Sequence, residues 1–175
     1  MARGTAVLKN FSSSSFRLRA ASFEIRLVYT FFLVLILGGL ATTWVFQFQR
    51  IGFNYQRIVA YYLGGEIQGQ IFFPKNLNVL LEETHFHTFM MSVVFLILSH
   101  LFLATSLGRH AKLFFIVVTF FSHALNVASP WLIRSHSPFF AYGLMAAWVG
   151  LWIGYLGMIG VPLYEMWSAL GLNKD

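Results

Sequence analysis

Two histidines of this sequence lie inside long apolar segments, where an ionisable side chain is costly and usually functional. His100 belongs to the segment 84–108 and His123 to the segment 113–133. A short basic turn at residues 108–112 joins the two segments, so we expect two antiparallel helices that lie side by side.

Residues at equal depth in such a helix pair have residue numbers with a constant sum. The sum is 223 for His100 and His123, and it is again 223 for His87 and His136. Two imidazoles that face each other across a helix pair can supply both axial nitrogens of a haem iron. We therefore predict a b-type haem between His100 and His123, with both axial positions filled by protein.

A second haem nearer the other end of the helices would need His136 and either His85 or His87. Thirteen residues of helix span about 20 Å, a plausible spacing for two haems stacked across a bilayer. His87 matches His136 in depth, but helix rotation places it about 220° from His100, whereas His85 lies only about 60° from His100. Both histidines remain candidates for the outer ligand.

The same outer region offers a different chemistry, because acidic and histidine side chains cluster there. A mononuclear zinc or copper ion could bind these groups, which are Glu82, Glu83, His85, His87 and His136. Glu82 and His85 have the Glu-x-x-His spacing of carboxylate-bridged di-iron bundles, but those sites need two such motifs and the sequence has one. Glu83 and His87 could equally form a surface ion pair.

The composition is that of an integral membrane protein, with 175 residues of which 58% are hydrophobic and 10% are charged. Four segments have the roughly 20 apolar residues that a span requires. They cover residues 27–46, 84–108, 113–133 and 137–164. We predict an all-α antiparallel bundle of four transmembrane helices at residues 23–166, preceded by a polar basic arm at 1–22 and followed by a short tail at 167–175.

Basic residues predict the orientation, because they are enriched in cytoplasmic segments. One side of the predicted topology carries Arg3, Lys9, Arg17, Arg19, Arg26, Arg109, Lys112 and Lys174, and the other carries Arg50, Arg57, Lys75 and Arg134. We therefore expect that the protein lies in a bacterial inner membrane with both termini in the cytoplasm.

The serine-rich basic arm resembles a mitochondrial transit peptide, which leaves the mitochondrial inner membrane as the alternative. We interpret the arm as retained on lipid headgroups or on a partner subunit.

The outer loop at residues 47–82 begins with an amphipathic pattern. Ile58 and Tyr62 fall on its apolar face and Arg57 on its polar face, which predicts a helix lying in the membrane interface. Gly64 and Gly65 should end this helix. An irregular segment is expected through Pro74, and Asn76 or Asn78 should then cap the second long helix.

The fourth span has small residues on one face, at Gly143, Ala147, Gly150, Gly154 and Gly157. Such a face favours close helix packing. Trp148, Trp152 and Tyr155 should then point to lipid or to a partner.

Several function classes are excluded or unsupported. The absence of cysteine excludes c-type haem attachment, thiolate-bound iron–sulfur clusters and thiol catalysis. The net charge of +6 follows the membrane topology, so we expect no nucleic-acid partner. No nucleophile–base pair or phosphate-binding loop is found, and we expect an electron relay or accessory subunit of an oxidoreductase complex, not an enzyme acting alone.

The four spans and the paired depths of His100 and His123 resemble the membrane cytochrome b anchor subunits of respiratory enzymes. That resemblance implies one or two b-type haems, partner subunits in the membrane and quinone as a possible redox partner. Two alternatives stay open on the residues alone. One is a cofactor-free structural subunit of a larger membrane complex, and the other is a metal-binding membrane protein that uses the outer Glu82–His87 cluster.

Overall fold

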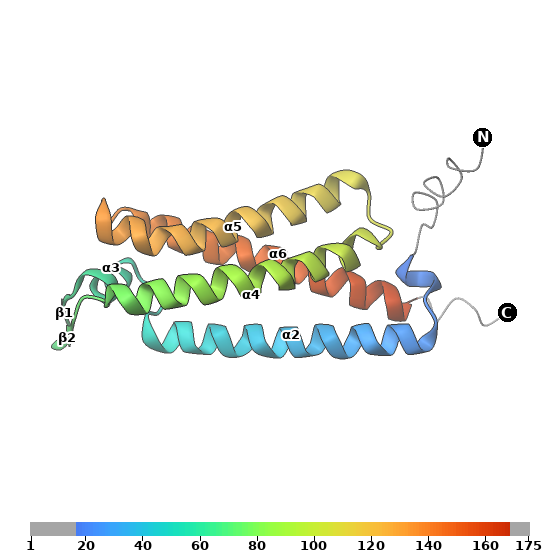
Figure 1. Cartoon of the computed structure of the whole chain (residues 1–175), viewed down its shortest axis with the longest axis horizontal. Helices are drawn as coiled ribbons and strands as arrows, with labels where there is room; N and C mark the ends of the chain where they lie inside the picture. The colour runs from blue at the N-terminus through green and yellow to red at the C-terminus, as the bar shows by residue number, and fades with distance from the viewer. Residues whose placement is uncertain (1–16, 169–175) are drawn as a thin grey trace, which may run out of the picture.

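The computed structural model describes residues 17–168 and contains four long helices and a small cap (Figure 1). The long helices are α2 (Phe23–Arg50), α4 (Leu77–Leu103), α5 (Arg109–Ser135) and α6 (Phe140–Ser168), and the shorter elements are η1 (Leu18–Ala20), α3 (Tyr55–Leu63), β1 (Gly65–Ile67) and β2 (Gln70–Phe72). Residues 1–16 of the predicted arm and residues 169–175 of the predicted tail lie outside the described residues.

The four long helices run up and down in alternation, so the predicted antiparallel bundle of four spans is confirmed. Each has 27 to 29 residues, which gives about 40 Å of helix, enough to cross a hydrocarbon core of about 30 Å. We call the end with α3 and the strands the hairpin end, and the opposite end, with η1 and the α4–α5 loop, the loop end.

A small cap of α3 and a β-hairpin closes the hairpin end of the bundle. The side chain of Asn54 accepts hydrogen bonds from the backbone N–H groups of Gln56 and Arg57, which starts α3. Gly64 ends it at a φ of 82°, a conformation that glycine adopts without strain. The apolar face of α3 packs on the bundle through Ile58 and Tyr62, both buried.

The segment after α3 differs from the prediction. We expected it to be irregular, but β1 and β2 pair in antiparallel register with Glu66 opposite Ile71. The turn between them uses Gln68 and Gly69, both with positive φ, as two-residue hairpins require. Asn76 caps α4 by accepting from the N–H of Asn78, which confirms one of the two predicted caps.

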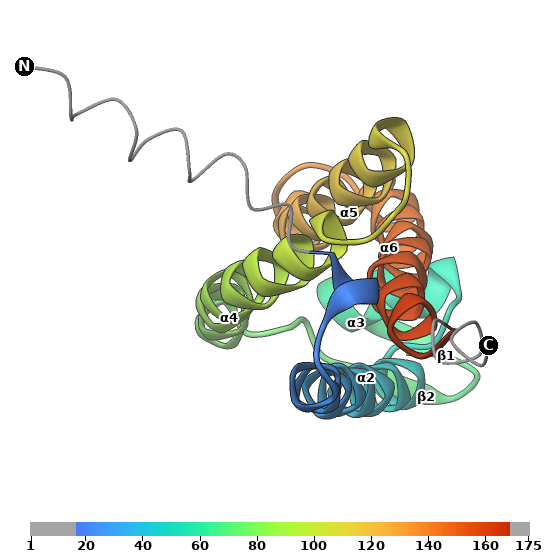
Figure 2. The ribbon, with the colours of Figure 1, turned by 90° about the vertical axis from the view of Figure 1, so that its right-hand side faces the viewer.

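The small-residue face of α6 packs against α5, which confirms the predicted close helix packing. A side chain at three of these glycines would overlap α5. The pairs are Gly150 with Ser122, Gly154 with Thr119, and Gly157 with Phe115. Figure 2, which looks along the bundle, shows α5 and α6 adjacent, with α4 and α2 completing the ring.

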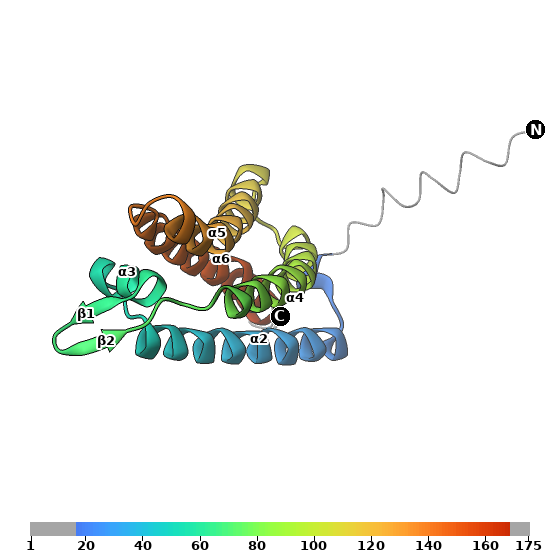
Figure 3. The same cartoon turned by 60° about the vertical axis from the view of Figure 1, so that its left-hand side comes forward.

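Helix α2 is attached more loosely than the other three. Within α2 only Leu33 is buried, and Figure 3 shows this helix lying along one side of the bundle, apart from the α5–α6 pair. At the loop end its Arg26 donates to the carbonyl oxygens of Ala21, Arg19 and Met166, which ties α2 to η1 and α6.

A buried carboxylate joins the elements of the loop end. Both carboxylate oxygens of Glu165, in α6, accept from the backbone N–H of Ser106 at 2.8 Å, and one accepts from the Ser106 hydroxyl at 2.6 Å. Arg19 lies 4.0 Å from the same carboxylate, which is 3% exposed. Glu165 therefore holds the α4–α5 loop and η1 against α6.

Substitution of Glu165 by alanine is expected to destabilise the fold by about 1–3 kcal/mol, because it leaves the Ser106 donors without their charged acceptor. Thermal unfolding of the purified protein measures this effect. Glu24, an exposed glutamate in the first turn of α2 near the same end, is the control, and Glu24→Ala should lower the melting temperature by less, since an exposed acid at a helix N-terminus contributes only about 0.3–1 kcal/mol. Equal melting temperatures for both variants would contradict the role given to Glu165.

The connection between α4 and α5 lies earlier in the chain than predicted. Helix α4 ends at Leu103 and α5 already begins at Arg109, and residues that meet across the two helices have numbers that add up to less than 223, as Phe95 with His123 and Thr84 with Trp131 show. The basic residues assigned to the turn belong instead to the first turn of α5, where Lys112 donates to the carbonyl oxygens of Leu103 and Thr105. His123 therefore meets Phe95 of α4, which lies between His87 and His100, and it is level with neither histidine.

Candidate functional site

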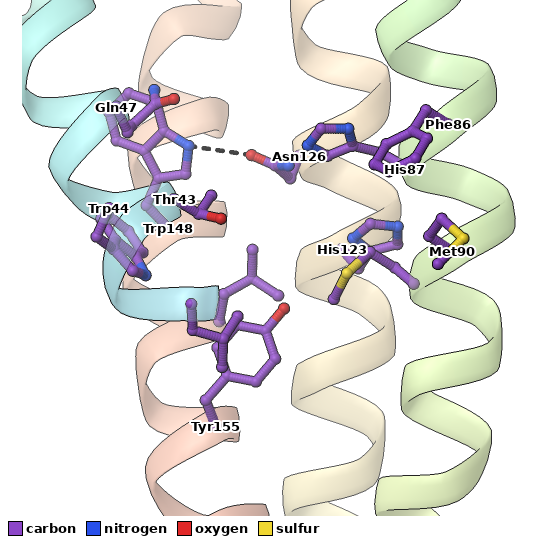
Figure 4. A pocket seen from close by; sticks show the side chains of 13 residues that line it. Thr43, Trp44, Gln47, Phe86, His87, Met90, His123, Asn126, Trp148 and Tyr155 are labelled. Carbon is purple, nitrogen blue, oxygen red and sulfur yellow. Dashed lines mark hydrogen bonds between the residues drawn. The ribbon is translucent and has the colours of Figure 1, made fainter. Parts of the chain in front are cut away.

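A cavity of about 240 Å³ lies among the four long helices, toward the hairpin end (Figure 4). We call it the histidine cavity, because it is lined by two of the predicted histidines from neighbouring helices. Its lining residues are Leu40, Thr43, Trp44, Gln47, Phe86, His87, Met90, Met91, His123, Asn126, Trp148, Leu151 and Tyr155. The lining is mostly aromatic and aliphatic, with a few polar groups, as in cofactor sites.

His123 supplies the most unusual polar atom of this cavity. Its side chain projects from α5 and is half-buried, and the ring of Phe95 meets it edge-on, with centroids 5.1 Å apart. Its Nε2 atom is buried and has no hydrogen-bond partner within the described residues. A buried imidazole nitrogen without a partner is costly, so this atom is available to bind a ligand.

His87, on α4, lines the same cavity and is also half-buried, and Figure 4 shows its ring nearer the level of Asn126 than that of His123. Its Nδ1 atom is 3.1 Å from the carbonyl oxygen of Glu83, one helical turn earlier. A carbonyl acceptor at Nδ1 places a proton on that nitrogen and directs ligand binding to Nε2, which is the arrangement common among metal-bound histidines. Figure 4 shows the rings of His87 and His123 directed into the space between α4 and α5.

Across the cavity from these rings, a hydrogen bond joins α5 to α6. The Nε1 atom of Trp148 donates to Oδ1 of Asn126 at 3.0 Å, drawn as a dashed line in Figure 4. Trp148 is 4% and Tyr155 is 7% exposed. The prediction that these two residues face lipid or a partner was wrong, whereas Trp152 is 45% exposed and does face outward.

The structure does not bring His100 into this cavity. His100 lies on the exposed surface of α4, with its Nδ1 atom 2.7 Å from the carbonyl oxygen of Leu96. The predicted facing pair of His100 and His123 is therefore not formed within the described residues, because the α4–α5 loop is shifted and the His100 side chain is exposed.

The two remaining histidines of the prediction are also exposed. His85 lies on the outer surface of α4. His136 follows the last residue of α5, and its Nδ1 atom is 2.6 Å from the hydroxyl of Ser135. The structure brings neither of them to His87.

The outer acidic residues engage a lysine, not the histidines. The Nζ atom of Lys75 donates to Glu83 at 2.5 Å and to the hydroxyl of Tyr61 at 3.1 Å, while Glu82 is exposed. The Lys75 side chain is only 8% exposed, so the Glu83 carboxylate is its principal charge partner. Within residues 17–168 no group of three or more histidine, aspartate or glutamate side chains could hold a metal ion.

Two further cavities adjoin the histidine cavity on its hairpin-end side. Their volumes are about 90 and 260 Å³, and both are lined by Gln47, Tyr62, Glu83 and His87. Burial raises the pKa of the Tyr62 phenol well above its usual value, so this side chain remains a neutral hydrogen-bonding group. We call these two spaces the outer cavities.

Comparison with known proteins gives a family for this chain. No curated protein and no solved structure matches it. A family model described as a transmembrane helical domain matches residues 52–173, which include α3, the β-hairpin, α4, α5 and both histidines of the cavity. Helix α2 precedes the matched residues. The chain therefore belongs to the Aq_1264_TM family of transmembrane helical domains.

Proposed function

We propose that this membrane protein relays electrons through one b-type haem whose axial ligands are His87 and His123. The observation that carries the proposal is the buried Nε2 atom of His123, which has no partner in the described residues although His87 lines the same cavity. This pairing replaces the pair of His100 and His123 expected from residue spacing. With both axial positions occupied by protein, the iron would have no open site for oxygen or substrate.

The side chains around the two histidines suit a porphyrin. A bound haem would supply reversible one-electron chemistry at its iron. Glu83 would hold the His87 ring through its carbonyl oxygen, and Trp44, Trp148 and Tyr155 would exclude water from the macrocycle. The Asn126 side chain would keep the Trp148 ring in place.

Binding a porphyrin requires more room than the histidine cavity now has. Its volume of about 240 Å³ is smaller than the macrocycle. Helix α2 forms one wall through Thr43, Trp44 and Gln47, and it is the least buried of the four long helices. An outward displacement of α2 would enlarge the cavity without breaking the α5–α6 contact.

The proposal also states in which membrane the protein lies, how it is oriented there and which partners it has. We place both termini on the cytoplasmic side of a bacterial inner membrane, and the grouping of Arg19, Arg26, Arg109 and Lys112 at the loop end supports this orientation. The electron donor and acceptor would be other membrane subunits of a redox complex, with quinone as the candidate small-molecule partner.

The alternative is a cofactor-free accessory subunit of a membrane complex. The outward-facing His100 favours it, because lipid offers no hydrogen-bond partner to a polar side chain at membrane depth. A neighbouring subunit that covers this face of α4 would provide one.

A reduced-minus-oxidised absorption spectrum of the purified protein, with a haemochrome count, tests the proposal directly. We expect a sharp b-type α-band and one haem per chain. A flat spectrum from folded protein supplied with haem would overturn it and favour the accessory subunit. Metal analysis of the same sample separates a third outcome, in which the two imidazoles hold copper or zinc instead of haem.

A further inference from the structure

Three cavities of the bundle meet at the same two side chains. Gln47 and His87 line both outer cavities and the histidine cavity. The larger outer cavity also reaches Arg50, at the end of α2, and Lys75 in the segment between the hairpin and α4. The three spaces therefore form a series that leads from the hairpin end to the histidines.

The groups along this series need water. Lys75 and Glu83 form an ion pair and Asn126 accepts from Trp148, but the charge of Arg50 and the amide of Gln47 are groups that hydrocarbon cannot satisfy. A water molecule occupies about 30 Å³, so cavities of about 90 and 260 Å³ hold several waters each. Glu83 provides contact with the outside, since its side chain is 42% exposed.

The series ends at the histidines. Toward the loop end the interior is filled by a cluster of buried apolar side chains, including Phe95, Leu98, Phe102 and Met158, each at most 1% exposed. Cavities lined only by such side chains stay dry. Water that enters from the hairpin end can thus reach the middle of the bundle but cannot cross it.

We propose that the outer cavities form a water-filled half-channel, open at the hairpin end and closed toward the loop end, which admits water and small hydrophilic solutes as far as His87. This inference goes beyond the electron-relay function and does not require haem. If the histidine cavity holds a porphyrin, the half-channel ends at His87. If it does not, the half-channel continues to His123.

Adjacent threonines of α2 allow a matched test, because the chain contains no cysteine. The hydroxyls of Thr42 and Thr43 both donate to the carbonyl oxygen of Gly39 at 2.9 Å, so the two residues have the same local structure. Both threonines are exposed in the bundle, but Thr43 lines the larger outer cavity and the histidine cavity, whereas Thr42 lines none of these three cavities. Both lie seven or eight residues before the end of α2 at Arg50, which is about 10 Å inside it.

The experiment labels Thr42→Cys and Thr43→Cys in proteoliposomes with a charged, membrane-impermeant methanethiosulfonate reagent. We expect Thr43→Cys to react at least about tenfold faster than Thr42→Cys when the reagent is on the hairpin-end side, because a thiol in lipid neither ionises nor meets the reagent. Reagent on the loop-end side should label neither variant. Asn126→Cys, which lines the smaller outer cavity, should also react from the hairpin-end side.

Equal labelling rates for the two threonine positions would overturn the half-channel, as would labelling of Thr43→Cys only from the loop-end side. Haem-loaded and haem-free protein should give the same order of rates, since Thr43 also lines an outer cavity. A failure of the haem proposal would therefore leave this result unchanged, and the two inferences can fail separately.

Discussion

Alanine in place of His123 is expected to abolish the b-type absorption band, and alanine in place of His87 should do the same. Each substitution removes one axial nitrogen, and a single remaining imidazole cannot hold the low-spin bis-histidine state. Removing even a hydrogen-bond partner of a metal ligand costs about 10–100-fold in affinity, so we expect at least about a tenfold loss of bound haem when a direct ligand is removed. Haemochrome counts and reduced-minus-oxidised spectra on equal amounts of protein measure the loss.

His100→Ala is the matched control, because His100 lies on the same helix as His87 but outside the cavity. Its haem content should equal that of the unchanged protein, and His136→Ala should behave likewise. If His100→Ala loses the haem while His87→Ala retains it, the ligand pair proposed from the cavity is wrong and the pair expected from the residue spacing is right. Circular dichroism of each variant shows that loss of haem is not loss of the fold.

The second large effect is expected at the contact between α5 and α6. A Cβ atom at Gly154 would lie 3.0 Å from Cβ and 3.3 Å from Cα of Thr119, and it would overlap the Thr119 hydroxyl. Gly154→Val should force the two helices apart, at a cost of about 1–3 kcal/mol or more. For a protein of this size that corresponds to a melting temperature lower by about 2–12 °C.

A glycine-to-valine substitution at another position of α6 distinguishes the effect of packing against α5 from the effect of valine on helix propensity. A Cβ atom at Gly160 would meet no atom within 4 Å in the described part of the chain. Gly160→Val should therefore leave the melting temperature close to that of the unchanged protein. Similar losses in both variants would mean that valine itself, not contact with Thr119, weakens the helix.

The number of spans could be predicted from composition, because hydrocarbon thickness fixes how many apolar residues a helix needs. The position of the α4–α5 loop could not. Arg109 and Lys112 are typical of a loop, but in the structure the Lys112 amine binds the last carbonyl groups of α4. The loop therefore comes before these residues, and every depth comparison between the two helices shifts with it.

The sequence predicts which histidines could form the candidate site, but not which two of them lie together. His87 and His123 were both candidates on grounds of rarity, and both line the cavity. Their pairing depends on the register of α4 against α5 and on the rotation of each helix, which residue spacing alone does not fix. Trp148 was assigned to the outside because the glycine face opposite it was expected to pack inward. In fact α6 is covered on both faces, and Asn126 was the sequence signal that a polar partner for an indole lay nearby.

The part played by α6 has a consequence for biosynthesis. Helix α6, which leaves the ribosome after α4 and α5, supplies both the glycine face against which α5 packs and the Glu165 carboxylate that accepts from Ser106. Until α6 is inserted, the α4–α5 hairpin lacks the acceptor for its loop and the surface against which α5 packs. Nascent chains truncated before Gly143 should therefore reach the membrane with three spans yet remain substrates for quality-control proteases, and the bundle should become protease-resistant only when the fourth span is in place.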